Sequence, residues 1–327
     1  MSVLVTGGAG YIGSHMVWAL VDAGEEVVVL DNLTTGVRAQ VSETARFVEG
    51  NAGDGELVRK IMRDNKVDAV IHFAGSIVVP ESIEKPLEYY VNNTGVTRRL
   101  LEACIAEGVR HFIFSSTAAV YGEVQGDKVA ESMPTMPINP YGRSKLMTEW
   151  MLEDTARAHD FRYVALRYFN VAGADPKGRT GQSTPRATHL IKRACQVALG
   201  RVPQLSIFGT DYETADGTGV RDYIHVADLV AAHALALDHL RKGGETQIFN
   251  CGYGDGFSVR QVINAVERVT GHKLATKEEP RRPGDPPTLV ADATRIRKNL
   301  GWTPEHNDLD EIVRTAYAWE SRLNDAG

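Results

Sequence analysis

The stretch Val3-Leu4-Val5-Thr6-Gly7-Gly8-Ala9-Gly10-Tyr11-Ile12-Gly13 opens the chain, and Val27-Val28-Val29-Leu30-Asp31 follows it after a helical pattern. A β-branched run that turns through glycines into a helix, followed by an apolar strand with a terminal carboxylate, is typical of dinucleotide-binding folds. The glycines allow the backbone to approach a pyrophosphate at a helix N-terminus. Asp31 is placed to bind a ribose diol and repel a 2′-phosphate, which favours NAD over NADP. The alternative for the glycine pattern alone is a tight turn that binds nothing.

The composition limits the classes of function. The chain has 327 residues, 43% of them hydrophobic, and a formal net charge of -6. This length is enough for a packed core and more than one lobe, and the acidic balance argues against nucleic acid as a partner. No apolar run approaches transmembrane length, and no signal peptide is visible, so we expect a cytoplasmic protein without a membrane partner.

The metal-binding and redox residues show no paired spacing. Cys104, Cys195 and Cys251 are isolated, and the ten histidines form no cluster of ligands. We therefore expect three buried thiols in a reducing compartment, and we expect no metal site.

Apolar strand patterns alternate with helical patterns through the first half of the chain. Strands are expected at residues 69–73, 111–116 and 163–168, and helices at residues 57–65, 87–107 and 141–159. This alternation predicts an α/β fold with a Rossmann-type doubly wound parallel sheet. Residues 1–170 would form the NAD-binding domain, completed by parts of about residues 222–250. Residues 171–327 would form a smaller α/β lobe that binds the substrate.

The segment Tyr141-Gly142-Arg143-Ser144-Lys145 carries a candidate acid–base pair. Tyr141 and Lys145 are four residues apart, so they share one face of a predicted helix. A nearby ammonium, or a positive nicotinamide ring, favours phenolate, so we expect a lowered pKa for Tyr141 and a role as general base. Thr117 follows a predicted strand in Ser115-Ser116-Thr117, where its hydroxyl could hold a substrate oxygen. The alternatives are two surface residues on a helix and a capping hydroxyl.

Taken together, these motifs resemble the extended short-chain dehydrogenase/reductase family and, within it, the UDP-glucose 4-epimerases. The resemblance covers nearly the whole chain and includes the segments Ile71-His72-Phe73-Ala74-Gly75, Lys85-Pro86-Leu87-Glu88-Tyr89-Tyr90, Arg167-Tyr168-Phe169-Asn170, Gly217-Thr218-Gly219-Val220-Arg221-Asp222-Tyr223-Ile224-His225-Val226 and Pro280-Arg281-Arg282-Pro283-Gly284-Asp285. It implies an NAD-dependent isomerase that interconverts UDP-galactose and UDP-glucose through a 4-keto sugar.

The resemblance also implies a role for each site residue. Tyr141 takes the proton from the sugar 4-hydroxyl, Thr117 hydrogen-bonds that oxygen, and Lys145 holds the nicotinamide ribose. The residues implied in cofactor binding are Gly7, Gly10, Tyr11, Ile12, Gly13, Asp31, Asn32, Asn51, Ala52, Phe73, Ala74, Gly75, Asn92, Ser115, Tyr141, Lys145 and Phe169. Those implied in substrate binding are Thr117, Tyr141, Asn170, His189, Leu190, Phe208, Arg221, Arg282, Asp285 and Leu289.

Several alternatives stay open on the sequence. Leu289 stands where family members carry a residue that gates the sugar 2-substituent, so the substrate could be a UDP-N-acetylhexosamine or another nucleotide sugar. A second alternative is an NAD-binding redox sensor, but such a protein does not need the Tyr141 and Lys145 that are present here. A third is a nucleotide-sugar 4,6-dehydratase, but that reaction needs acidic residues where Ala118 and Ala119 stand. The helices at residues 87–107 and 141–159 pair across a homodimer in the family, which implies a homodimer here.

Overall fold

The computed structural model describes residues 1–124, 126, 128–184, 188–282 and 285–323. The chain divides into two compact units. The first unit comprises Met1–Gly122, Pro134–Arg167 and Val230–Phe249, and the second comprises Glu123–Met133, Tyr168–Leu229 and Asn250–Gly327. Within the described residues, no helix is both long and apolar enough to cross a membrane.

A seven-stranded sheet forms the centre of the first unit. Its strand order is β10 (Gln247–Cys251), β6 (Arg162–Tyr168), β5 (His111–Thr117), β4 (Val67–His72), β1 (Ser2–Thr6), β2 (Glu26–Asp31) and β3 (Arg46–Glu49). The pairs β1–β2, β1–β4, β2–β3 and β4–β5 are parallel. Parallel strands place their C-terminal ends along one edge, where ligands bind in doubly wound folds. The α/β fold with a Rossmann-type sheet is therefore confirmed.

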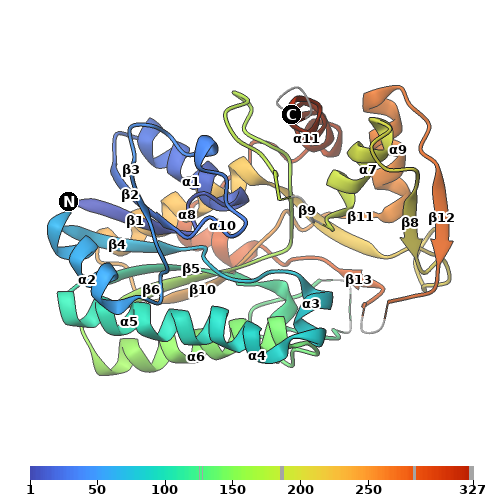
Figure 1. Ribbon diagram of the computed structural model, residues 1–327. Coiled ribbons are helices and arrows are strands. Elements are labelled where there is room, and N and C mark those ends of the chain that lie inside the picture. Colours follow the sequence, from blue (N-terminus) through green and yellow to red (C-terminus); the bar gives the residue numbers. More distant parts are fainter. Residues whose placement is uncertain (125, 127, 185–187, 283–284, 324–327) are drawn as a thin grey trace. The chain divides into compact units, whose positions relative to one another are not determined.

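Helices cover both faces of this sheet. Figure 1 shows α2 (Gly55–Asp64), α5 (Val96–Glu107) and α6 (Pro140–Ala158) along one face, and α1 (Tyr11–Asp22) and α8 (Val226–Arg241) on the other. The core between sheet and helices is apolar and includes Leu4, Val70, Phe112 and Leu152, each with no exposed surface. Burial of the strands on both faces explains why their sequences are almost continuously apolar.

The helix predicted over residues 87–107 is divided in the structure, which corrects the sequence-based prediction. A short helix α3 (Val79–Glu84) is followed by α4 (Pro86–Tyr89), a π-helical segment η2 (Tyr90–Gly95) and then α5. The wider turn accommodates Asn93, whose buried side chain accepts a hydrogen bond from the Ser76 amide (2.7 Å) and donates one to the Ser144 hydroxyl (2.9 Å). Such wide turns concentrate at functional sites, and apolar periodicity does not reveal them.

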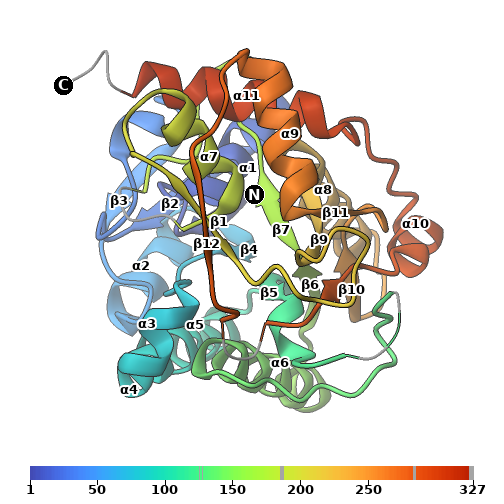
Figure 2. The same cartoon turned by 90° about the vertical axis from the view of Figure 1, so that its right-hand side faces the viewer.

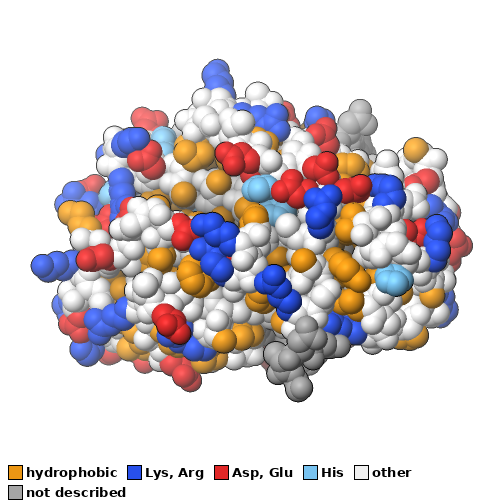
Figure 3. All heavy atoms as spheres, turned by 90° about the horizontal axis from the view of Figure 1, so that it is seen from above, with side chains coloured by type: hydrophobic (Ala, Val, Ile, Leu, Met, Phe, Trp, Pro, Cys, Tyr) orange, Lys and Arg blue, Asp and Glu red, His pale blue; other side chains and the backbone are white. Residues whose placement is uncertain are grey.

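The second unit has two small sheets and a group of packed helices. Strand β9 (Val220–His225) pairs with β11 (Gly256–Ser258), β13 (Thr288–Leu289) and β7 (Asn170–Ala172), while β8 (Leu205–Phe208) pairs with β12 (Thr276–Glu279). Figure 2 shows α7 (Leu190–Ala198), α9 (Val259–Thr270) and α11 (Leu309–Arg322) packed together, and α10 (Thr294–Leu300) lies between α9 and α11 in the sequence. On the face drawn in Figure 3, basic and acidic side chains are interspersed.

Candidate active site

The glycine-rich turn between β1 and α1 leaves no room for side chains at two positions. Gly7 has a φ of +71°, and a Cβ there would lie 2.6 Å from the Ala74 backbone nitrogen. A Cβ at Gly13 would lie 2.1 Å from the Gly7 carbonyl oxygen. The turn therefore packs its backbone against a neighbouring loop and against the first turn of α1, as a pyrophosphate cradle requires.

The Asp31 carboxylate, at the C-terminal end of β2, fixes the loops beside this turn. One oxygen accepts a hydrogen bond from the Ala9 amide (2.9 Å), and the other accepts one from the Leu33 amide (2.8 Å). Each oxygen keeps a second lone pair, so the side chain can still accept from a ribose hydroxyl. The next residue, Asn32, accepts hydrogen bonds from the amide and hydroxyl of Thr34.

Several of the other predicted cofactor residues of the first unit follow neighbouring strands at the same edge, and Asn92 lies in η2. The amides of Phe73 and Ala74, after β4, donate to the Thr6 carbonyl oxygen at the end of β1. Asn51, two residues after β3, accepts from the Gly53 amide, and Asn92 donates to the Ser76 hydroxyl. This polar edge, with its cradle of glycines, fits a dinucleotide.

Tyr141 and Lys145 lie in the first two turns of α6. Pro140 begins this helix, and the Asn139 side chain caps it by accepting from the Gly142 amide (2.8 Å). The Lys145 ammonium donates to the Ser115 carbonyl oxygen (2.9 Å) and lies 4.9 Å from the Phe114 ring centroid. Lys145 therefore ties the helix to the end of β5.

The Tyr141 hydroxyl forms a hydrogen bond with Thr117 at the end of β5. Tyr141, Lys145 and Thr117 are all buried, with 7%, 4% and 8% of their surface exposed. The structure thus brings the three predicted catalytic side chains together at the C-terminal edge of the sheet. A buried group needs little reorganisation when the reaction begins, which suits acid–base chemistry.

The pKa of Tyr141 differs from the sequence-based prediction. Burial raises the pKa of this phenol, and the hydrogen bond from Thr117 opposes the rise. The expected lowering of this pKa by Lys145 is therefore wrong, because the loss of hydration of a phenolate outweighs the effect of a cation that donates to the Ser115 carbonyl. Burial also lowers the pKa of Lys145 to about 8.

A cluster in the second unit joins four of the predicted substrate residues. The Arg282 guanidinium donates to the Asp285 carboxylate (2.9 Å) and lies 4.8 Å from the Phe208 ring centroid. A nitrogen of Arg221 lies 3.7 Å from the same carboxylate. Two guanidinium groups that share one carboxylate, one of them over an aromatic ring, suit a nucleoside diphosphate. Pro283 and Gly284, from the segment 280–285 that carries part of the resemblance, lie outside the described residues.

The remaining predicted substrate residues lie on other strands and on α7. Leu289 is in register with Arg221 across β13 and β9, and Asn170 is in register with Tyr223 across β7 and β9. His189 and Leu190 stand at the start of α7, where burial and then Lys192 lower the pKa of His189. A neutral imidazole cannot offer a charge to a diphosphate, although it can still hydrogen-bond one.

Phe169, the predicted cofactor residue outside the first unit, is buried and stands between β6 and β7 in the sequence. The sequence-based prediction missed Ser144 and Asn93, which connect α6 to the loop after β4. Glu149 was also missed, although it repeats the four-residue spacing of Tyr141 and Lys145.

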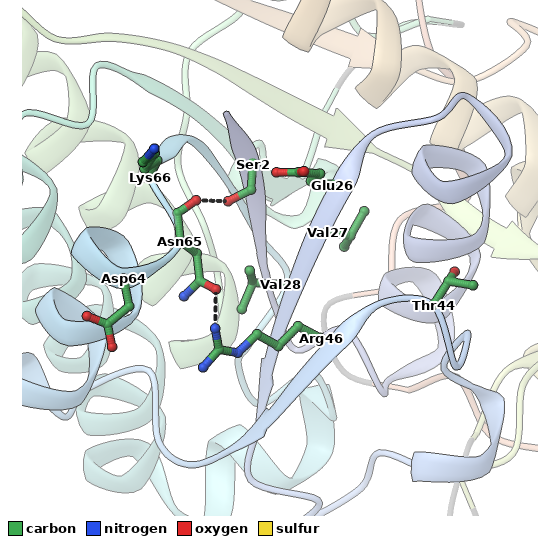
Figure 4. A pocket seen from close by; sticks show the side chains of 9 residues that line it. All are labelled: Ser2, Glu26, Val27, Val28, Thr44, Arg46, Asp64, Asn65 and Lys66. Carbon is green, nitrogen blue, oxygen red and sulfur yellow. Dashed lines mark hydrogen bonds between the residues drawn. The ribbon is translucent and has the colours of Figure 1, made fainter.

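A separate hollow of about 380 Å³ contains none of the predicted site residues. Figure 4 shows that it is lined by the starts of β1 and β2 and by residues 64–66, and that Arg46 in it donates to Asn65 (2.7 Å). It lies at the N-terminal ends of the parallel strands, so it is distinct from the edge described above.

Comparison with known proteins agrees with this geometry. The sequence model of the NAD dependent epimerase/dehydratase family matches residues 3–252, and the chain belongs to this family. Its cofactor is accordingly NAD.

Within this family the chain is similar to UDP-glucose 4-epimerases. It is 60% identical to the enzyme of Azospirillum brasilense over 98% of this chain and 92% of that protein. It is 46% identical to the structure of UDP-glucose 4-epimerase from Brucella ovis in complex with NAD, with a TM-score of 0.95 and 98% of each chain covered. It is 47% identical to the UDP-Glc/GlcNAc 4-epimerase from Campylobacter jejuni, with a TM-score of 0.86, covering 98% of this chain and 99% of that one.

Proposed function

We propose that this protein interconverts UDP-galactose and UDP-glucose by reversible oxidation at C4, through a 4-keto sugar. The observation that carries the proposal is the buried group of Tyr141, Lys145 and Thr117 beside a dinucleotide cradle. The curated relatives with 45–60% identity over almost the whole chain are UDP-glucose 4-epimerases, which supports the same reaction.

The residues that would hold NAD belong mainly to the edge of the first unit. Gly7, Gly10 and Gly13 would allow the diphosphate to approach the N-terminus of α1. Asp31 would accept from a ribose, and Phe73, Ala74 and Gly75 would flank the cofactor; the other proposed contacts are Tyr11, Ile12, Asn32, Asn51, Ala52, Asn92, Ser115, Tyr141, Lys145 and Phe169. When bound, NAD supplies a reversible acceptor for the hydride of C4.

Three side chains would take part in the transfer of the proton from the sugar 4-hydroxyl. Tyr141 would receive this proton as general base and return it to the 4-oxygen when the 4-keto sugar is reduced again. Thr117 would hold the same oxygen, and its hydrogen bond would stabilise the phenolate of Tyr141. Lys145 would bind the nicotinamide ribose, and its ammonium would offset charge that develops nearby.

The arginine cluster of the second unit would bind the nucleotide. Arg221 and Arg282 share the Asp285 carboxylate in the structure, so a diphosphate could take over one or both of these contacts. Phe208 would stack on the uracil, and Asp285 would then accept from the uridine ribose. Asn170, His189 and Leu190 complete the proposed substrate contacts.

Leu289 supports a second candidate substrate, a UDP-N-acetylhexosamine. It lies beside Arg221 in the sheet and is partly buried. A leucine leaves more room for a 2-acetamido group than a tyrosine does, and the Campylobacter jejuni relative is named for both UDP-Glc and UDP-GlcNAc. We expect Leu289→Tyr to abolish any turnover of UDP-N-acetylgalactosamine and to spare turnover of UDP-galactose. Equal loss of both activities would remove Leu289 as the selective residue.

We also propose a homodimer. Neighbouring helices α3, α4 and α6 and the segment η2 carry exposed apolar side chains, namely Ile83, Leu87, Val91, Met147 and Trp150. Large exposed apolar side chains on adjacent helices are typical of a protein interface. Light scattering should give twice the mass of the chain, and Leu87→Glu combined with Trp150→Glu should give a monomer. A wild-type monomer at assay concentrations would contradict this proposal.

The three cysteines, Cys104, Cys195 and Cys251, are buried free thiols. Burial raises the pKa of each, which keeps the thiols protonated and unreactive. These properties support our proposal of a reducing, cytoplasmic location.

The deciding experiment is incubation of the purified protein with UDP-galactose without added NAD, with chromatography of the products. Formation of UDP-glucose is expected, because the cofactor is regenerated in each cycle. If no UDP-glucose forms even with NAD supplied, the proposed reaction is wrong, and binding of NAD without turnover, as in a redox sensor, becomes the better explanation.

A further inference from the structure

Four buried polar side chains surround the turn that carries Thr117. Ser116, at the end of β5, donates a short hydrogen bond to the Glu149 carboxylate of α6. Arg167 of β6 donates to both oxygens of that carboxylate, from Nε to Oε1 (2.9 Å) and from Nη2 to Oε2 (2.5 Å). Its third contact is with the Tyr121 hydroxyl (3.0 Å). We call Ser116, Glu149, Arg167 and Tyr121 the Glu149 ring.

Burial of the charged groups of this ring costs free energy. The Arg167 and Glu149 side chains are only 6% and 3% exposed, and Ser116 and Tyr121 are also buried. Removing such an ion pair from water cancels most of its attraction, so apolar residues of the same size often give equal or greater stability. The ring is therefore better explained by the geometry that it imposes than by the stability that it adds.

That geometry concerns the catalytic residues directly. Ser116 precedes Thr117, and Tyr121 ends the single turn of 3₁₀ helix, Ala118–Val120, that follows it. Both ends of this short segment are tied to the same ion pair. The position of the Thr117 hydroxyl thus depends on Glu149 and Arg167 through the backbone of this segment.

Helix α6 carries the side chains that contact the end of β5. Tyr141, Lys145 and Glu149 succeed one another at intervals of four residues, so they share one face of the helix. They contact Thr117, the Ser115 carbonyl and Ser116 in turn. The Glu149 ring is the third of these attachments, and it fixes the rotation and height of α6 against the end of β5.

We propose that Glu149 and Arg167 are positioning residues for the reaction, which set the hydrogen bond between Thr117 and Tyr141. This inference rests on the proposed function, because it assigns the pair to the proton-transfer step. The hydrogen bond from Thr117 opposes the raised pKa of Tyr141. Loosening the ring should therefore raise the pKa of Tyr141 further and slow the chemical step without changing substrate binding.

The test compares Glu149→Gln with a control in the same unit. Asp68→Asn is the control, because it breaks the ion pair of Asp68 with Arg241 (2.8 Å), and Asp68 lies near the start of β4, away from the catalytic edge. We expect Glu149→Gln in the NAD-bound protein to lower kcat by about 10–100-fold, as a small misplacement does, with KM for UDP-galactose within about twofold. Asp68→Asn should lose thermal stability and keep the wild-type kcat.

A titration separates this inference from the proposed reaction. Tyrosinate absorbance is followed against pH, and the curve of the matching Tyr141→Phe protein is subtracted to isolate Tyr141. Glu149→Gln should show a higher pKa for Tyr141 than the wild type, whether or not UDP-galactose is a substrate. An unchanged pKa of Tyr141, with an unchanged kcat, would overturn the positioning role.

Milder variants keep the test open if Glu149→Gln does not fold. Ser116→Ala and Tyr121→Phe each remove one hydrogen bond to the ion pair and leave the pair itself intact. Because both act through the same pair, their effects on kcat should be non-additive. Two additive effects, or none on kcat and on the pKa of Tyr141, would contradict the proposal.

Discussion

The two units differ in how they hold their functional side chains. In the first unit, Tyr141, Lys145 and Thr117 are almost completely buried and hydrogen-bonded to one another or to the backbone. In the second, the Arg282 and Asp285 side chains are 52% and 30% exposed and pair with each other. The buried groups are fixed before any ligand binds, whereas the exposed groups are held by ion pairs that a ligand can replace.

This difference separates the expected effects of substitution. Changes among the buried groups of the first unit should lower kcat, because they alter interactions made at the reacting atoms. Changes in the arginine cluster should raise KM, because they remove contacts made equally by the bound substrate and the transition state. The following predictions test that separation.

The largest effect is expected for Tyr141→Phe. Loss of a positioned general base should lower kcat by about 10²–10⁴-fold, with KM for UDP-galactose and the amount of bound NAD nearly unchanged. Steady-state kinetics and the absorbance of released cofactor measure these quantities. Wild-type turnover by this variant would show that Tyr141 is not the base.

The second-largest effect is expected for Arg221→Met. Loss of a charge-assisted contact to the diphosphate, worth about 1.5–3 kcal/mol, should raise KM for UDP-galactose by about 10–100-fold with a small change in kcat. Arg260→Met is a matched control, since Arg260 belongs to the same unit and pairs with Glu278 on the surface. If both variants behave alike, the arginine cluster has no special role.

The pH dependence of kcat/KM should show the loss of the Lys145 ammonium charge. Burial lowers its pKa to about 8, so its ammonium is present below this value and is lost above it. If the charge supports catalysis, kcat/KM of the wild type should fall as pH rises through about 8. A pH–rate profile that retains the same fall in Lys145→Met would exclude Lys145 as its cause.

The lowered pKa of Lys145 also affects the stability of the folded protein. The unfolded chain binds this proton more tightly than the folded chain, so the cost of burying the charged Lys145 is present below about pH 8 and decreases as pH rises toward 10.5. Thermal unfolding of the NAD-free protein at pH 7 should therefore show a stabilised Lys145→Met variant. Destabilisation by this variant would show that the hydrogen bond to Ser115 outweighs the cost of burial.

Arg282→Ala should have the smallest effect. Its side chain is half exposed, so solvent screens its interaction with a diphosphate, and we expect KM to rise by only about 2–5-fold. Calorimetric titration with UDP measures the same loss without catalysis. A rise larger than that of Arg221→Met would reverse our ranking of the two arginines.

Local sequence signals predicted the parts of the site that depend on local structure. The glycine turn at Gly7 and Gly13 and the pairing of Tyr141 with Lys145 on one helix follow from residue type and spacing, and the structure contains both. The ends of the parallel strands could be placed because alternating elements predict such a sheet.

Features that depend on distant contacts could not be predicted in this way. The π-helical turn at Asn93 depends on Ser76 and Ser144, which are remote in the sequence. The raised pKa of Tyr141 depends on burial, and the Glu149 ring depends on the approach of β6 to α6. The spacing of residues along one helix contains no information on these contacts between distant segments.

The most direct test of the proposed reaction uses UDP-galactose labelled with tritium at C4. If the hydride leaves C4 and returns to the same carbon within one active site, the UDP-glucose formed should retain the label and the water should gain none. Release of tritium to water during conversion would contradict the account, because it would show that C4 loses its hydrogen as an exchangeable proton.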